Sequence, residues 1–171
     1  AQDVDDDTKL SKAVVTSTVV LTTTQQQEID EYVTYSAGKL IDGADYEVPA
    51  ARARLHQPFN DPSATEIFKG RYSISICRRL AGAVSEQQRV VTRLNAMILL
   101  RSVAAKGVED LIRAGLSDGN PSVRYLASKA AAGDGKRPEL ELGQKKAILD
   151  ALTRAFRNET DPLVAGQVLL G

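Results

Sequence analysis

Five arginines in the second half of the chain have the residue type best suited to binding an anion. Arg78, Arg79, Arg89 and Arg93 lie in the segment CRRLAGAVSEQQRVVTRL, and Arg124 follows in VRYLASKAA. A guanidinium is planar and permanently charged, and it pairs with phosphate or carboxylate through two parallel hydrogen bonds. We therefore take Arg78, Arg79, Arg89, Arg93 and Arg124 as a candidate binding surface that would line one groove.

No residues form a recognisable catalytic motif. His56 is the single histidine and stands next to Gln57-Pro58, so we expect a loop or cap residue rather than a general base. Cys77 precedes an arginine, which can lower the pKa of a thiol, but no base accompanies it in the sequence. We expect Cys77 to be a buried packing residue and the protein to have no catalytic residues.

Metal and phosphate motifs are also missing from the sequence. Residues 3–7 contain four aspartates, but they lack the glycine and the distal glutamate of an EF-hand calcium loop, so a solvated tail is expected. Residues 133–136, Gly-Asp-Gly-Lys, lack the spacing of a phosphate-binding loop. A single cysteine excludes an intramolecular disulfide and a cysteine-rich zinc site. We expect no cofactor and no metal.

The composition is that of an ordinary globular domain. The chain has 171 residues, 43% hydrophobic and 26% charged, with no tryptophan and only 5% aromatic residues. One domain is the default at this length. Alanine, leucine and valine must build most of the core, which favours closely packed helices. The longest apolar stretch, residues 95–100, is far too short to span a membrane.

The charges and the first residues bear on partners and compartment. Residues 1–50 carry a net charge of −7 and residues 51–171 carry +7. The two parts could attract each other, or the second could present a basic face to an anionic partner. The chain begins Ala1-Gln2-Asp3. Either a secretory signal was removed after a small residue or a longer chain was trimmed; the first explanation, which we favour, predicts an exported protein, periplasmic or extracellular and of bacterial type.

Helical periodicity and capping residues predict a series of helices. A capping box of Thr24 with Gln27 starts the first, and boxes of Ser63 with Glu66 and Ser85 with Gln88 start later ones. Residues 13–24 are rich in β-branched residues and fit either a strand or a helix; we lean to extended or irregular structure. The predicted helices cover about 24–42, 49–55, 62–84, 85–105, 108–116, 121–132, 139–158 and 162–169. Their apolar faces include Ile67, Val90, Leu142, Leu149, Phe156 and Leu169.

The helices contain an internal repeat. DLIRAGLSDGNPSV aligns with ALTRAFRNETDPLV, and TRLNAMILL aligns with VRYLASKAA, which pairs Arg93 with Arg124. The spacing is 31 to 41 residues, with two helices in each unit. Such a period is typical of an α-solenoid.

Residues 111–133, LIRAGLSDGNPSVRYLASKAAAG, resemble a HEAT repeat. The match consists of an aspartate turn followed by Val-Arg and an alanine-rich helix, with Asp118, Pro121, Val123, Arg124, Ala127 and Ala130. The copy at 161–170 departs from the pattern because Ala165 stands where the arginine would be. The resemblance implies an all-α fold of antiparallel helix pairs, stacked as a short right-handed α-solenoid after an irregular N-terminal segment. It also implies that Asp118 and Arg124 join adjacent repeats.

These observations predict one helical-repeat domain that binds other molecules. We expect a tail or irregular segment at 1–23 and a repeat domain at 24–171, composed of cap helices (24–60) and three helix pairs (61–105, 106–133 and 139–171). The expected function is non-enzymatic: a protein-interaction or scaffold module whose partner is a protein. The alternative is a solenoid that binds nucleic acid through its arginine-rich groove. Self-association through an open end of the stack is a further expectation.

Overall fold

The computed structural model describes residues 9–135 and 137–170. Every regular element in this part of the chain is a helix, which confirms the predicted all-α class. The aspartates at positions 3–7, expected to form a solvated tail, lie outside the described residues. The helices are α1 (Lys12–Val15), α2 (Thr23–Asp42), α3 (Val48–Asn60), α4 (Glu66–Leu80), α5 (Val90–Leu100), α6 (Val108–Leu116), α7 (Pro121–Ala132), α8 (Leu142–Asn158) and α9 (Pro162–Val168).

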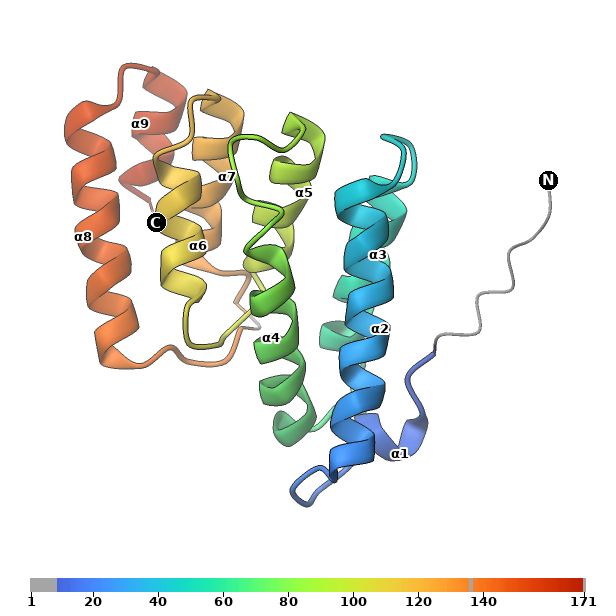
Figure 1. Cartoon of the computed structure of the whole chain (residues 1–171). Coiled ribbons are helices and arrows are strands. Elements are labelled where there is room, and N and C mark those ends of the chain that lie inside the picture. The colour runs from blue at the N-terminus through green and yellow to red at the C-terminus, as the bar shows by residue number, and fades with distance from the viewer. Residues whose placement is uncertain (1–8, 136, 171) are drawn as a thin grey trace.

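The eight longer helices form two layers (Figure 1). One layer contains α2, α4, α6 and α8, and the other contains α3, α5, α7 and α9. Within each layer every helix packs against the next one, and the contacts of α2 with α3, α6 with α7 and α8 with α9 join the two layers. Helices α2 and α3 lie at one end of the molecule, and α8 and α9 lie at the other end.

Side-chain caps fix where several helices begin. Asn120 accepts a hydrogen bond from the Ser122 N–H at 2.9 Å, and Asp161 accepts one from the Leu163 N–H at 2.9 Å, as predicted for the starts of α7 and α9. The predicted capping box of α2 was wrong by two residues. Thr22 caps the helix, and the Gln25 side chain accepts the Thr22 N–H at 2.9 Å. The box could form there because the Thr-Gln run offers the same three-residue spacing of threonine and glutamine two residues earlier.

Helix α3 continues through Pro58, contrary to the predicted break at residues 56–63. Proline lacks an N–H, so the carbonyl of Arg54, four residues earlier, loses its helical partner. The hydroxyl of Tyr32 on α2 donates to that carbonyl at 3.0 Å and replaces the missing bond. The helix therefore tolerates Pro58 in its last turn, and His56 is a helical residue rather than a loop residue.

Helices α4 and α5 begin later than the sequence predicted. Thr65 rather than Ser63 caps α4, and the Thr65 hydroxyl also donates to the Ser17 carbonyl at 2.7 Å. Residues 85–89 form a turn rather than the first turn of a helix, and α5 covers Val90–Leu100 instead of 85–105. The capping-box pattern therefore predicted helix starts at Ser63 and Ser85, but both residues lie in turns that precede the helices.

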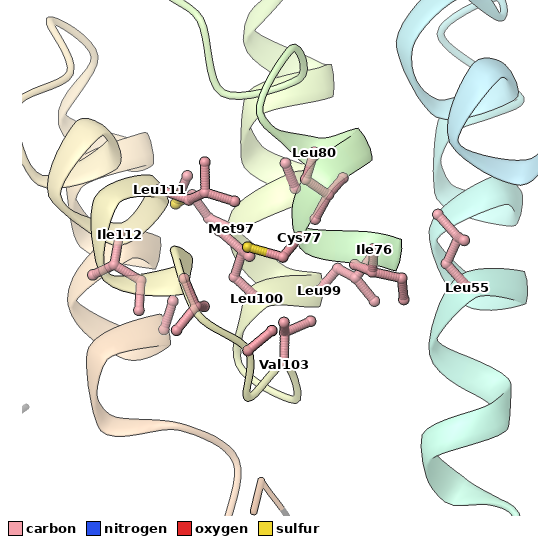
Figure 2. Packing of buried hydrophobic residues seen from close by; sticks show 14 of the residues in the cluster. Leu55, Ile76, Cys77, Leu80, Met97, Leu99, Leu100, Val103, Leu111 and Ile112 are labelled. Atoms are coloured by element: carbon pink, nitrogen blue, oxygen red, sulfur yellow. The ribbon is translucent and has the colours of Figure 1, made fainter. Parts of the chain in front are cut away.

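The core is one continuous cluster of buried apolar side chains that reaches from Val14 to Val168. At its centre, Cys77 of α4 lies near Met97 and Leu100 of α5 (Figure 2). Gly115 allows α6 to approach this region closely, because a Cβ there would lie 2.5 Å from the Met97 sulfur. Small residues thus permit the tight helix packing that the alanine-rich composition predicted.

Several apolar residues of the predicted helix faces are exposed. Ile67 and Val90 are 40% and 39% exposed, near the starts of α4 and α5. The others lie together at the α8–α9 end of the molecule, where no further helix covers them in the part of the chain that the structure describes: Leu142, Leu149, Phe156 and Leu169.

Candidate functional site

Arg93 is buried rather than displayed on a groove. It is the fourth residue of α5, and its Nη1 donates to Asp118 Oδ2 at 2.6 Å. The two side chains are only 9% and 1% exposed. Asp118 stands in the turn between α6 and α7, and its other oxygen accepts the Asn120 N–H at 2.8 Å. The Arg93–Asp118 pair therefore connects α5 to the next turn of the fold.

Arg124 makes the same kind of connection one step further along the chain. It is the fourth residue of α7, and its Nε and Nη2 donate hydrogen bonds to the Glu159 carboxylate at 2.7 and 2.8 Å. Its Nη1 donates to the carbonyls of Asp118 and Gly119 at 2.9 and 3.2 Å. This bidentate contact lowers the pKa of Glu159 to about 2 and raises the pKa of Arg124.

The two arginines occupy equivalent places. Each is the fourth residue of its helix, and each binds an acid two residues before the cap of a later helix. Helix α9 has Ala165 at that position, so the series ends there. A charge-assisted hydrogen bond contributes about 1.5–3 kcal/mol to stability. We interpret these contacts as the framework that fixes the spacing of the helices.

The other three predicted arginines lie apart from this pair. Arg89, before α5, donates to Asp45 at 2.6 Å and to the carbonyl of Gly43 at 2.6 Å, so it binds the α2–α3 turn. Arg78 and Arg79, at the end of α4, are exposed and have no hydrogen-bond or ion-pair partner among the described residues. Thus carboxylates engage Arg89, Arg93 and Arg124, and only Arg78 and Arg79 remain available to a ligand.

His56 takes part in a polar cluster that sequence analysis missed. Its Nε2 lies 2.8 Å from the Ser102 hydroxyl, and its Nδ1 lies 2.8 Å from the Asn60 amide nitrogen. The Ser102 hydroxyl in turn donates to Asp134, which follows α7. The Asn60 amide nitrogen can only donate, so Nδ1 accepts from it, and in the neutral ring the proton is then on Nε2, toward Ser102. The serine is therefore a bridge between His56 and Asp134 rather than a hydroxyl deprotonated by the histidine.

This cluster forms one wall of a small pocket between α3, α5 and the segment after α7. The pocket has a volume of about 310 Å³ and is lined by Arg52, His56, Asn60, Ile98, Arg101, Ser102 and Asp134. Arg52, His56 and Asn60 recur every fourth residue of α3 and so share a face, which was a usable sequence signal. Nothing in the sequence indicated that Ser102 and Asp134 would join them.

Cys77 is a packing residue, as predicted. Its side chain lies in the core, with the sulfur 3.7 Å from the Lys106 carbonyl (Figure 2). Burial, together with the nearby acids Glu109 and Asp110, raises the pKa of the thiol to about 11. At neutral pH the residue is a protonated thiol, which is a poor nucleophile.

A row of exposed apolar side chains follows α8. Leu142, Leu149 and Phe156 are spaced seven residues apart and are 82%, 62% and 42% exposed. Seven residues are close to two helical turns, so the three side chains lie on one face. Ala151, about 200° around the helix from Leu149, lines the space next to Leu116 of α6. The exposed row therefore points away from α6, and Leu149 also lines a pocket with Pro138 and Leu140 of the segment after α7. Helix α8 itself lies at one end of the molecule (Figure 1).

Helix α9 extends this apolar area, and basic residues flank it. Leu163, Leu169 and Leu170 are 78%, 68% and 79% exposed. We call the area formed by Leu142, Leu149, Phe156, Leu163, Leu169 and Leu170 the end face. Lys145, Lys146 and Arg157 are exposed on the same side of α8, where Lys145 pairs with Glu139 and Asp150 lies at the margin. The end face is thus an apolar area whose rim carries both basic and acidic side chains, with the basic ones in slight excess.

The described residues contain no group of three or more histidine, cysteine, aspartate or glutamate side chains arranged to hold a metal ion. None of the described helices combines the length and apolar character needed to cross a bilayer. Comparison of the chain with models of protein families, with curated proteins and with solved structures finds no match. The HEAT resemblance therefore rests on the residues of the chain alone and stays a prediction.

Proposed function

We propose that this chain is a short HEAT-like right-handed α-solenoid that acts as a non-enzymatic protein-interaction module and binds its partner through the end face. The observation that carries the proposal is the set of six exposed apolar side chains on α8, on α9 and directly after α9. Exposed apolar areas of this kind, rimmed by polar residues, commonly mark protein interfaces. Large apolar anchors contribute most of the binding energy in such interfaces.

The solenoid part of the proposal is supported by the two layers of helices and by the recurring arginine contacts. Arg93 and Arg124 hold equivalent places on consecutive helices of one layer, at the 31-residue spacing of the repeat. In a repeat protein each unit buries its apolar face against its neighbours, so a face of a repeat that no neighbour covers is apolar. The end face has the character expected for such a position.

Charge indicates the chemistry of the partner. Lys145, Lys146 and Arg157 flank the apolar row of α8. Lys145 pairs with the exposed Glu139 and Asp150 lies beside the row, so Lys146 and Arg157 carry the positive charge that no acid of the described residues pairs with. A partner helix with apolar residues at i, i+3, i+4 and i+7 and acidic residues on both sides of that row would match both features. We therefore propose an acidic amphipathic helix of another protein as the occupant.

The nucleic-acid alternative receives less support from the contacts of the arginines. Arg89, Arg93 and Arg124 already donate to carboxylates, and Arg93 is buried. Releasing any of them to a phosphate would leave an acid unpaired, which is costly when that acid is buried. Arg78 and Arg79 alone provide a much smaller basic surface than the five arginines considered from the sequence.

The test is a crosslinked affinity purification from native lysate with three forms of the protein. Leu149→Glu/Phe156→Glu alters the end face, and the control Val20→Glu changes an apolar residue that is 84% exposed elsewhere. We expect Val20→Glu to alter the unfolding free energy by less than about 0.5 kcal/mol. Leu149 and Phe156 have more of their surface covered, so we expect their replacement to cost about 1–3 kcal/mol per site while the chain stays folded. The proposal predicts a protein captured by wild type and V20E but lost with L149E/F156E.

Three results would contradict this assignment. One is an equal set of proteins captured by all three forms, and another is a capture that nuclease treatment abolishes. The third is recovery of the chain itself as the main crosslinked species, which would replace a foreign partner with self-association. Sedimentation velocity of the purified protein distinguishes the third result, because self-association would depend on protein concentration and would be lost with L149E/F156E.

A further inference from the structure

The pocket beside His56 contains two arginines whose charges are not neutralised. Arg52 of α3 and Arg101, just after α5, both line it. Neither guanidinium has a hydrogen-bond or ion-pair partner among the described residues, and the Nε atom of each is buried without one. A buried donor without an acceptor is destabilising, and the described residues supply no acceptor for these two Nε atoms.

The contrast with other arginines of similar burial supports this point. Arg71 pairs with Asp30, Arg93 with Asp118 and Arg124 with Glu159, so each has a carboxylate partner although Arg71 Nη1 and Arg93 Nε are themselves buried without a hydrogen-bond partner. The side chain of Arg137 donates to the carbonyls of Ala130 and Ala131. Arg54 stacks on the rings of Tyr32 and Tyr35. Among the partly buried arginines that the structure describes, Arg52 and Arg101 differ from these, and they share one pocket.

The acid in the pocket is already engaged. One oxygen of Asp134 accepts from the Ser102 hydroxyl, and the other accepts the Arg137 N–H at 3.0 Å. Two guanidiniums beside one such carboxylate leave an excess of positive charge, and the amide of Asn60 adds a neutral polar group. The remaining chemistry of the pocket is therefore that of a receptor for a negatively charged group.

The geometry points to a site for a small oxyanion, namely the phosphate or carboxylate group of a small molecule, held between Arg52 and Arg101. Guanidiniums bind both groups through paired charge-assisted hydrogen bonds. The volume of about 310 Å³ is at the lower limit for small-molecule pockets, so the ligand is a compact one. The site is separate from the end face, because it is built by α3, α5 and the segment after α7.

Isothermal titration of the whole chain at low salt tests the site with inorganic phosphate in one arm and acetate in the other. We expect saturable one-to-one binding in at least one arm, and the tighter arm identifies the phosphate or the carboxylate class. Arg52→Gln and Arg101→Gln should each weaken that binding about tenfold or more. The control Arg154→Gln, which removes an exposed arginine on α8, should leave it unchanged.

A measurement on the wild-type protein keeps the test independent of folding of the variants. On titration with the bound anion, NMR shifts should concentrate at the Nε–H groups of Arg52 and Arg101 and at the amides of His56 and Ser102, and they should saturate. Two outcomes would overturn the site: non-saturating shifts spread over exposed cations such as Arg157, and binding by R52Q and R101Q that equals wild type. Absence of binding in both arms at millimolar anion would overturn it as well.

Discussion

Removing the charge of Asp118 should destabilise the protein far more than removing an exposed acid of the same type. Asp118→Asn keeps the shape of the side chain and an acceptor for the Asn120 N–H, but it leaves the guanidinium of Arg93 without a counter-charge. Breaking a buried ion pair by removal of one partner costs about 3–5 kcal/mol. Because Arg93 retains slight exposure, 8% for the whole residue, we expect about 3 kcal/mol.

The control is Asp110→Asn. Asp110 pairs with Arg113 at 2.7 Å, but the two side chains are 60% and 54% exposed. Such a pair contributes about 0.2–1 kcal/mol. In a chain of 171 residues, a loss of 3 kcal/mol lowers the melting temperature by about 6–12 °C, whereas the control should move it by less than about 4 °C.

Urea denaturation followed by circular dichroism measures both variants, and Arg93→Met completes the cycle. The double variant Arg93→Met/Asp118→Asn has no unpaired charge, so it should recover at least half of the stability lost by Asp118→Asn. Two results would refute the reasoning. In the first, D118N costs no more than D110N; in the second, the two single losses simply add in the double variant.

Three further outcomes follow from particular residues. The pKa of Glu159 is lowered to about 2 in the folded chain, so its contribution to stability is present above about pH 4.5 and is lost as the pH falls toward 2; the urea midpoint of Glu159→Gln should depend less on pH in this window than that of wild type. Cys77 has a pKa of about 11 and is 7% exposed, so a disulfide reagent such as DTNB at pH 8 should label it only on unfolding, and rapid labelling of the native protein would contradict its burial. Gly115→Ala should cost about 1–3 kcal/mol because its Cβ would meet Met97, while Gly38→Ala, with nothing within 4 Å, should stabilise α2 by about 0.5–1 kcal/mol; denaturation curves with the opposite order would show that α6 is not closely packed.

The sequence predicted helices best where a cap and a periodic apolar face coincide. Asn120-Pro121 and Asp161-Pro162 meet both conditions, and α7 and α9 begin there. The predicted length of α3 was too short because proline usually ends a helix. The hydroxyl of Tyr32, which takes the place of the hydrogen bond that Pro58 cannot make, comes from another helix. Information of that kind lies in the tertiary structure and not in the local sequence.

Turns whose sequence resembles a helix cap explain why the start of α5 was predicted too early. Ser85 with Gln88 has the spacing of a capping box, but the backbone there forms a turn before α5 begins at Val90. The hydroxyl of Ser85 accepts the Gln87 N–H at 3.4 Å, a local contact that competes with the helix. Ser85 does bind a backbone N–H, as a capping residue would, but it does so within a turn and not at a helix start.

The arginines show how far residue type alone can lead. Their number and spacing suggested a groove for an anion, but Arg93 and Arg124 use their charge inside the fold. Arg52 and Arg101, which have no hydrogen-bond or ion-pair partner in the part of the chain that the structure describes, belong to no sequence motif. They come to line one pocket only because α3 packs next to α5 and residue 134 in the folded chain.

The most direct test of the proposed function places a photo-crosslinking amino acid at position 149, in the centre of the end face, and at position 20 as a control. Both positions are exposed, at 62% and 84% for the native residues. Irradiation in native lysate should give a discrete protein adduct from position 149 only, and mass spectrometry should place the crosslink on an acidic amphipathic helix of the partner. Equal adducts from both positions, or none from position 149, would contradict an interface on α8 and α9.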